Sequence, residues 1–208
     1  MTLIGTVAFQ LYPCPLGAFL SAAAMQTQDA DLAISRLAIP QVAGAEPIEK
    51  TLQRADPSFA AAMSRDDKLP KRFRAASGFE VDVLTTLGRT AGPVSIKGIA
   101  SAATPLRFMD YLLEDTIDVV ALYGPGVLVR VPDPARFAVH KLIVAHHRPA
   151  HTRKAGKDLW QARELIDLFE RDDPGRIEDA LDNARKRGPQ WRQAIAASLR
   201  TFTPARAS

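Results

Sequence analysis

Two stretches in the first half of the chain alternate between polar and apolar residues. They are DADLAI at Asp29–Ile34 and FEVDVL at Phe79–Leu84, and a period of two predicts half-buried strands. In LIGT, residues 3–6, an apolar pair runs directly into Gly-Thr, which predicts a strand that turns sharply into a helix. Residues 41–70 are helix-prone but interrupted by three prolines, so we interpret them as a surface excursion.

The second half begins with a predicted hairpin and is helical after it. IDVVAL (117–122) and VLVRV (127–131) flank a Tyr-Gly-Pro-Gly turn. Asp-Pro pairs at 133 and 173 are typical helix starts, since aspartate caps the helix and proline fits its first turn. The predicted helices cover 133–147, 154–171, the stretch from 174 to Gly188, and 191–202. These elements predict an α/β (α+β) fold, with a small mixed sheet in a domain over residues 1–132 and a C-terminal helical bundle over 133–208 packed on it.

The composition of the 208 residues is that of an ordinary globular protein, with 47% hydrophobic and 24% charged residues. The apolar start of the chain lacks a basic segment and carries prolines, so we interpret it as buried structure and not as a targeting segment. No run has the length and purity of a membrane span. The single cysteine, Cys14, excludes an internal disulfide and a cysteine-based zinc site, and we expect it to be a buried small side chain. A cytoplasmic location fits this pattern.

Positive charge is concentrated between residues 136 and 163. The net charge of the whole chain is +4, yet this segment holds seven lysines and arginines against Asp158 alone, together with all four histidines. Such a patch is typical of a site that binds a phosphate-rich ligand, and it is equally typical of a helix surface that faces solvent. We expect the four histidines to be surface residues or phosphate neighbours and not metal ligands; they are His140, His146, His147 and His151.

Three aspartates on the predicted strands are candidate metal ligands. Asp29 and Asp31 are two residues apart, so both side chains leave the same face of their strand. Paired carboxylates repel unless a cation lies between them, and oxygen ligands of this kind suit Mg²⁺ or Mn²⁺. Asp82 interrupts an apolar strand, where a carboxylate is costly unless it is paired or bound to metal. The alternative for Asp82 is a solvent-facing strand side that it shares with Glu80.

The order of motifs resembles the nucleotidyltransferase fold of the DNA polymerase β superfamily. Gly5-Thr6 at a strand-to-helix turn, where free N–H groups can meet a phosphate, is followed by the Asp-x-Asp pair and then by Asp82 between two valines. Together with PLRFMDYLLED and YGPGVLVRVPDPARFAVHKLIVAHHR, these motifs resemble the bacterial NTP-transferase-8 group. More distantly they resemble the nucleotidyltransferase toxins of abortive-infection and toxin–antitoxin systems.

The resemblance implies roles for individual residues. Asp29, Asp31 and Asp82 would hold the catalytic Mg²⁺ or Mn²⁺, and Gly5 and Thr6 would receive the phosphate tail of an NTP. The cations and the acid implied for nucleotide binding are Lys141, Arg148, Lys157 and Asp158. The implied activity is transfer of a nucleoside monophosphate from an NTP to an unidentified acceptor, with RNA, a protein or a small molecule as the candidates. We further expect a toxin–antitoxin-like partner and no association with a membrane.

Several points stay open in the sequence. Lys141 lies in an apolar stretch, where either a phosphate or a salt bridge with Asp158 that ties two helices together would satisfy it. Asp29 comes 23 positions after Thr6, a longer separation than in most nucleotidyltransferases. Arg36, Lys71 and Arg72 lie between the motifs with no assigned role. Besides the enzyme, we consider a non-catalytic relative that binds nucleotide, nucleic acid or a partner protein, and a basic nucleic-acid-binding module.

Overall fold

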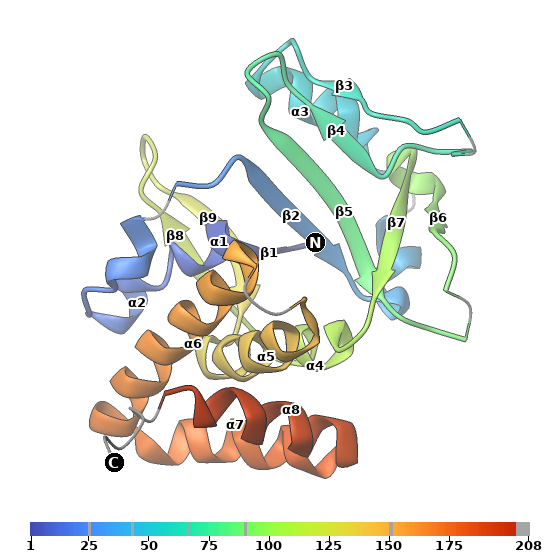
Figure 1. Ribbon diagram of the computed structural model, residues 1–208. Helices are drawn as coiled ribbons and strands as arrows, with labels where there is room; N and C mark the ends of the chain where they lie inside the picture. The colour runs from blue at the N-terminus through green and yellow to red at the C-terminus, as the bar shows by residue number, and fades with distance from the viewer. Residues whose placement is uncertain (25, 43, 66, 90, 150–151, 203–208) are drawn as a thin grey trace. The chain divides into compact units, whose positions relative to one another are not determined.

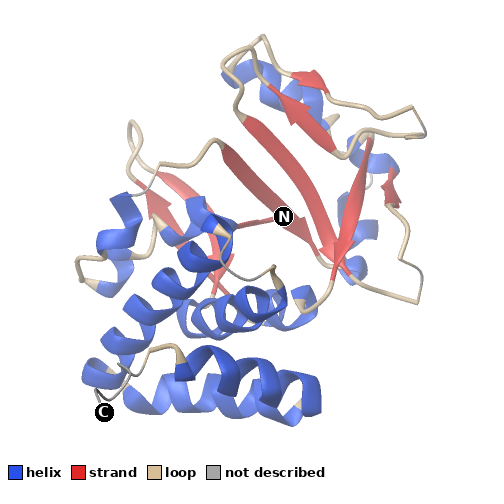
Figure 2. Ribbon diagram, in the orientation of Figure 1, coloured by secondary structure: helices blue, strands red, loops and turns tan. Residues whose placement is uncertain are grey.

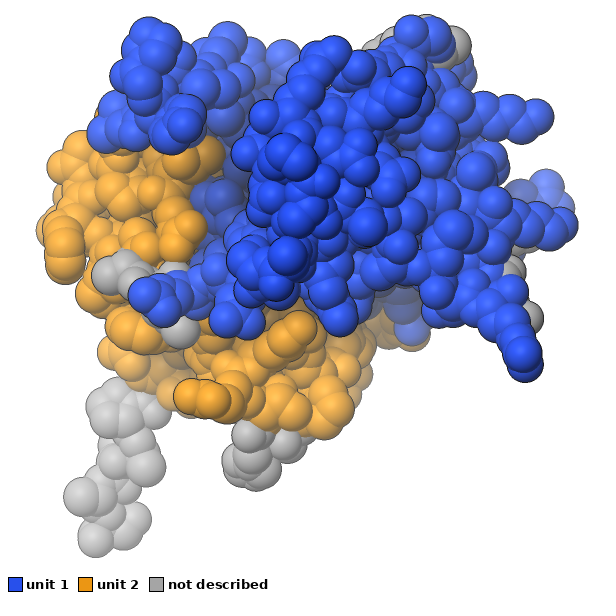
Figure 3. All heavy atoms as spheres, turned by 90° about the horizontal axis from the view of Figure 1, so that it is seen from above, with its two compact units in different colours: residues 1–8, 26–131 blue, residues 9–25, 132–208 orange. Residues whose placement is uncertain are grey.

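Two compact units make up the chain, and they do not follow one simple cut in the sequence. The computed structural model describes residues 1–24, 26–42, 44–65, 67–89, 91–149 and 152–202. The first unit comprises residues 1–8 and 26–131, and the second comprises residues 9–25 and 132–208, as coloured in Figure 3. The chain therefore leaves the first unit after Ala8 and returns to it at Gln26, which accounts for the long separation between Thr6 and Asp29.

A mixed sheet of seven described strands forms the first unit (Figure 1). Its strands are β1 (Thr2–Ile4), β2 (Asp29–Ile34), β3 (Ala60–Ala61), β4 (Arg72–Arg74), β5 (Glu80–Thr86), β6 (Val94–Ile96) and β7 (Ser101–Leu106). β5 is central: it pairs in parallel with β2 on one side, while antiparallel β4 and parallel β7 share its other side. β1 extends the sheet antiparallel to β2, so the mixed sheet predicted from the sequence is confirmed.

Short helices and a hairpin complete this unit. They are α1 (Gly5–Phe9), the 3-10 helices η2 (Arg36–Val42) and η3 (Lys97–Ile99), α3 (Ile48–Ala55), α4 (Met109–Glu114), and the paired strands β8 (Thr116–Ala121) and β9 (Val127–Pro132). The predicted hairpin is confirmed, and Gly124 and Gly126 in its turn both have positive φ. The predicted strands at 29–34 and 79–84 are confirmed as well, the second displaced by one residue at its start.

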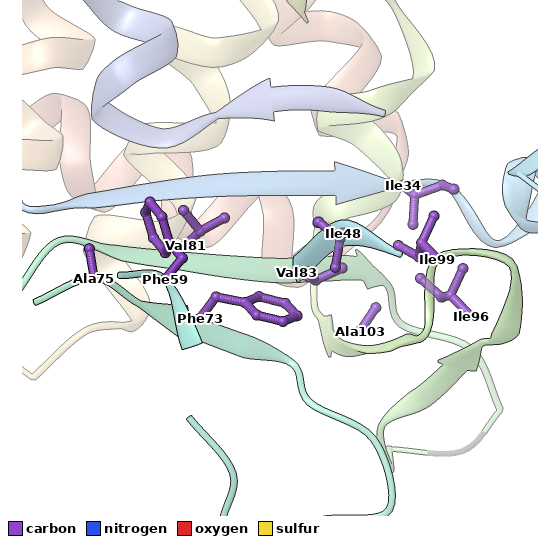
Figure 4. Close-up of a cluster of buried hydrophobic side chains, with 10 residues drawn as sticks. All are labelled: Ile34, Ile48, Phe59, Phe73, Ala75, Val81, Val83, Ile96, Ile99 and Ala103. Carbon is purple, nitrogen blue, oxygen red and sulfur yellow. The ribbon is translucent and has the colours of Figure 1, made fainter. Parts of the chain in front are cut away.

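One face of the sheet is covered by a hydrophobic core (Figure 4). Phe73 and Val83 are fully buried in it, and Val81 is 4% exposed. Ile48 of α3 and Phe59 lie in the same cluster, so the interpretation of residues 41–70 as a surface excursion is wrong. Pro47 and Pro57 flank the helix α3 and do not interrupt it, and the apolar side chains of this stretch still reach the core.

Helices build the second unit (Figure 2). They are α2 (Pro13–Leu16), the 3-10 helix η1 (Ser21–Ala24), α5 (Pro134–His147), α6 (Arg153–Asp172), α7 (Pro174–Lys186) and α8 (Pro189–Arg200). Asp133 accepts hydrogen bonds from the backbone N–H groups of Ala135 and Arg136, so the predicted cap of α5 is confirmed. Cys14 is exposed, contrary to expectation, because it belongs to a one-turn helix with no buried residue. Among the described residues, no helix combines the length and apolar character needed to cross a membrane.

Candidate functional site

The face of the sheet opposite the hydrophobic core is charged. Strand alternation sends Val81 and Val83 into the core, so their neighbours Glu80 and Asp82 leave from the other face. We call this the polar sheet face, and define it by six side chains: Asp29 and Asp31 of β2, Glu80 and Asp82 of β5, and Arg72 and Arg74 of β4. Four carboxylates against two guanidiniums leave two negative charges on this face.

Register brings Asp31 and Asp82 side by side. In the parallel pairing of β2 with β5, Asp31 lies directly opposite Asp82, and Asp29 lies opposite Glu80. Direct cross-strand partners point to the same face with their Cβ atoms about 5 Å apart. Two aspartates that are 51 positions apart in the chain therefore become neighbours. Asp29 lies one row further along the strands, where its carboxylate accepts a hydrogen bond from the Thr27 hydroxyl.

Arg72 binds both oxygens of the Asp82 carboxylate. Its Nε donates to Oδ1 at 2.6 Å and its Nη2 donates to Oδ2 at 2.8 Å, while Nη1 lies 3.1 Å from an oxygen of Glu80. The hydrogen bond to Asp82 raises the pKa of Arg72 above its usual value, and the charges of Asp82, Glu80 and Asp31 raise it further. Sequence reasoning gave Arg72 no role, because the three residues Arg-Phe-Arg of β4 are too few to reveal a strand with both arginines on one face.

Gly5 borders this pair of aspartates. A Cβ at Gly5 would lie 2.5 Å from Oδ2 of Asp31, and the φ of Gly5 is +71°. Ile4, the residue before it, is the register partner of Asp31. A glycine is thus required here on two grounds, backbone conformation and the space needed by the Asp31 carboxylate. Thr6 is buried in the short helix α1 that follows.

We expect Gly5→Ala to lower the free energy of unfolding by more than backbone strain alone. A positive φ costs about 1–2 kcal/mol for a residue with a Cβ, and the clash with Asp31 adds to that. Gly124→Ala is the matched control, because Gly124 has a φ of +54° and nothing within 4 Å of the added Cβ. Urea unfolding of both variants measures the difference, and equal losses would contradict the close approach of Gly5 to Asp31.

The carboxylates fit a divalent cation by their chemistry. Hard oxygen donors on one face, with Asp31 and Asp82 in register and excess negative charge, are what Mg²⁺ or Mn²⁺ prefers. Within the described ranges, however, no three His, Cys, Asp or Glu side chains are grouped closely enough to form a ready metal site. The arrangement is thus a carboxylate pair, Asp31 and Asp82, with Asp29 one row away. Arg72 supplies the positive charge beside this pair.

The remaining predicted residues gather in the second unit, between α5 and α6. Asp158 is 1% exposed, and its two oxygens accept hydrogen bonds from Lys141 Nζ and Arg148 Nε, each at 2.6 Å. Burial would raise the pKa of Asp158, but the adjacent charges of Lys141 and Arg148 outweigh it and the pKa is lowered. The salt bridge that ties two helices together, one of the two alternatives for Lys141, is present. Lys157 is half-buried beside Asp158 on α6.

His140 lies in the same helix interface and is fully enclosed. It is 8% exposed, and neither ring nitrogen has a hydrogen-bond partner among the described residues. Burial lowers the pKa of His140 to about 3, and the charge of Lys141 acts in the same direction. The expected surface position therefore holds for His146 and His147, which are exposed, and is wrong for His140. His151 is outside the described residues.

We expect the buried His140 to make the protein less stable in mild acid. The unfolded state takes up a proton near pH 6.5 and the folded state does not until about pH 3, so the free energy of unfolding falls as pH decreases between these values. We expect His140 to account for about 1 kcal/mol of loss between pH 7 and 5.5. Urea titrations at both pH values measure it, and His140→Gln should flatten the dependence. An unchanged pH dependence in that variant would rule out the proposed titration.

Comparison with known proteins places these residues in a wider context. A family model described as Nucleotidyltransferase matches residues 1–186. Among solved structures, the chain is similar to an antigenic nucleotidyltransferase-like protein from Paracoccidioides brasiliensis, with 16% sequence identity, a TM-score of 0.42, and coverage of 94% of this chain and 84% of that one. No curated protein sequence matches significantly. The family match spans every candidate site residue, from Gly5 to Asp158.

Proposed function

Because this chain belongs to the nucleotidyltransferase family whose model matches residues 1–186, we propose that it transfers a nucleoside monophosphate from an NTP to an acceptor in a reaction that needs a divalent metal. The observation that carries this proposal is the in-register pair of Asp31 and Asp82 on adjacent parallel strands, beside a glycine that leaves room for the Asp31 carboxylate.

In this proposal the polar sheet face supplies the metal ligands. Asp31 and Asp82 would hold Mg²⁺ or Mn²⁺ with Asp29 as the third ligand, and a bound cation would neutralise charge on the triphosphate and on the leaving pyrophosphate. Asp82 would also orient the acceptor hydroxyl. Gly5 keeps side-chain atoms away from Asp31 at the turn where Gly5 and Thr6 would meet the phosphate tail.

The cluster of Lys141, Arg148 and Asp158 in the second unit would have a supporting role. Lys141 and Arg148 already share the two oxygens of Asp158, so one of their two positive charges is neutralised before any ligand binds. Arg148 is the more accessible of the two cations, with 36% of its side chain exposed against 10% for Lys141. We therefore propose Arg148 as the member of this cluster that is best suited to contact a phosphate, with Lys141 and Asp158 holding it in position.

A non-catalytic relative is the second candidate, and one observation favours it. Arg72 occupies both oxygens of Asp82 and neutralises the carboxylate that a catalytic metal would need. A protein with this fold would then bind nucleotide, nucleic acid or a partner protein without transferring a nucleotide.

One experiment separates the two candidates. The purified protein is incubated with each α-labelled NTP and Mg²⁺ in the presence of mixed RNA and of protein extract. Label that becomes covalently attached to an acceptor, and that disappears on chelation of the metal, supports the enzyme. Metal-stabilised NTP binding with no attached label supports the non-catalytic relative. RNA binding that is steeply salt-dependent and indifferent to Asp82→Ala, with no attached label, would contradict the enzyme and favour a basic nucleic-acid-binding module.

A further inference from the structure

Arg72 pairs directly with Asp82, one of the carboxylates of the candidate metal site. Its guanidinium donates to both oxygens of Asp82, contacts Glu80 at 3.1 Å, and is near enough to Asp31 for that charge to act on it. A two-pronged pairing of this kind is the strongest geometry between arginine and a carboxylate. The polar sheet face thus contains its own positive charge where the proposed reaction requires a metal ion.

A divalent ion that binds Asp31 and Asp82 meets an obstacle in this pairing. One lone pair on each Asp82 oxygen is already engaged, and a full positive charge lies within hydrogen-bond distance of the ligand atoms. Like charges this close repel strongly on a partly enclosed surface. Glu80 gives the guanidinium a second partner on the same strand, so Arg72 can leave Asp82 without losing all its pairing.

We propose that Arg72 is a built-in competitor of the metal: it holds Asp82 beside Asp31 when no metal is bound, and must release Asp82 before a divalent cation can bind there. This inference rests on the proposed function for the identity of the metal site. It assigns Arg72 as a positioning residue, which stabilises the carboxylate pair in the metal-free protein and sets the metal concentration that the site needs.

Binding of Mn²⁺ alone, measured by the electron paramagnetic resonance signal of the free ion, tests the proposal without NTP or turnover. We expect Arg72→Ala to bind Mn²⁺ about threefold to fivefold more tightly than the unchanged protein, since exposed ion pairs of this type have modest strength. Arg74→Ala is the matched control, because Arg74 has the same charge on the same strand and face but, among the described residues, its ion pair is with Glu80 and not with Asp82. Its affinity should change by less than about twofold.

Two further variants keep the test decisive. Arg72→Lys retains the charge and loses the two-pronged geometry, so it should fall between Arg72→Ala and the unchanged protein. Adding Asp31→Ala to Arg72→Ala should remove the gain, which would locate the tighter Mn²⁺ at this carboxylate pair. Circular dichroism confirms that each variant is folded.

The experiments distinguish failure of the Arg72 proposal from failure of the proposed nucleotide transfer. Mn²⁺ affinity in Arg72→Ala equal to or weaker than in Arg74→Ala would overturn the proposal, as would a gain that survives Asp31→Ala. Tighter, Asp31-dependent Mn²⁺ binding in a protein that attaches no nucleotide under any condition would support the role of Arg72 and refute the proposed transfer.

Discussion

Asp31→Ala is expected to reduce nucleotide transfer by at least about a thousandfold while the protein stays folded. A metal ion contributes several kcal/mol of charge stabilisation in phosphoryl transfer, and each 1.36 kcal/mol is a tenfold change in rate. Asp31 is the carboxylate that register places beside Asp82, and a side chain at Gly5 would clash with it. The measurement is attachment of α-labelled nucleotide at saturating NTP, so that the loss is assigned to the rate and not to substrate binding.

Asp118→Ala is the matched control for this experiment. Asp118 lies on β8 of the same unit and pairs with Arg130 at 2.9 Å, but it is exposed and belongs to the separate two-stranded sheet of β8 and β9. Its removal should leave transfer unchanged. Asp31→Asn keeps the size of the side chain and removes its charge, so it should be as inactive as the alanine variant. Substantial activity in Asp31→Asn would contradict the assignment of Asp31 as a metal ligand.

Asp158→Ala is expected to lower the free energy of unfolding by about 3–5 kcal/mol. It would leave the ammonium of Lys141 buried without its carboxylate partner, and breaking a buried ion pair on one side has this cost. Urea unfolding followed by circular dichroism gives the loss. Asp182→Ala provides the comparison, because Asp182 pairs with Arg185 on the surface of α7 and its removal should cost less than about 1 kcal/mol.

A double replacement separates the structural role of this ion pair from a role in nucleotide binding. Lys141→Met combined with Asp158→Leu removes both buried charges, and substitutions of this kind often restore stability. If the pair only ties α5 to α6, the stable double variant should retain NTP affinity. A folded double variant that has lost NTP affinity would instead support the nucleotide-binding role implied by the family resemblance.

The strands that the sequence revealed were those with a long, regular alternation. β2 and β5 have six and seven residues, and each alternates between core and polar face, so their hydrophobic pattern was visible. β4 and β6 have three residues each, too few for a period to appear, and β7 contains a proline. β4 and β7 pair with β5, and β6 pairs with β7, so the cause of these strands is tertiary and leaves little local trace.

The aspartates of the candidate site were found from the sequence, but their arrangement was not. Residue type and alternation marked Asp29, Asp31 and Asp82. Only the register of β2 against β5 decides that Asp31, and not Asp29, is opposite Asp82. The antiparallel pairing of β4 with β5 in turn places Arg72 opposite Asp82. Buried Lys141 and His140 show a similar limit. The sequence indicated that Lys141 needed a partner, but not that His140 would be buried with no hydrogen-bond partner among the described residues.

The second unit is assembled from two distant pieces of chain. The hydroxyl of Tyr12 donates to the carbonyl of Pro132, 120 positions later, and the backbone N–H groups of Ser21 and Ala22 donate to the carboxylate of Glu164. As the chain leaves the ribosome, residues 9–25 therefore emerge long before the helices that complete their contacts. For the same reason, cutting the gene after residue 131 would not separate the two units. It would leave an apolar segment without its neighbours and deprive the remaining helices of part of their core.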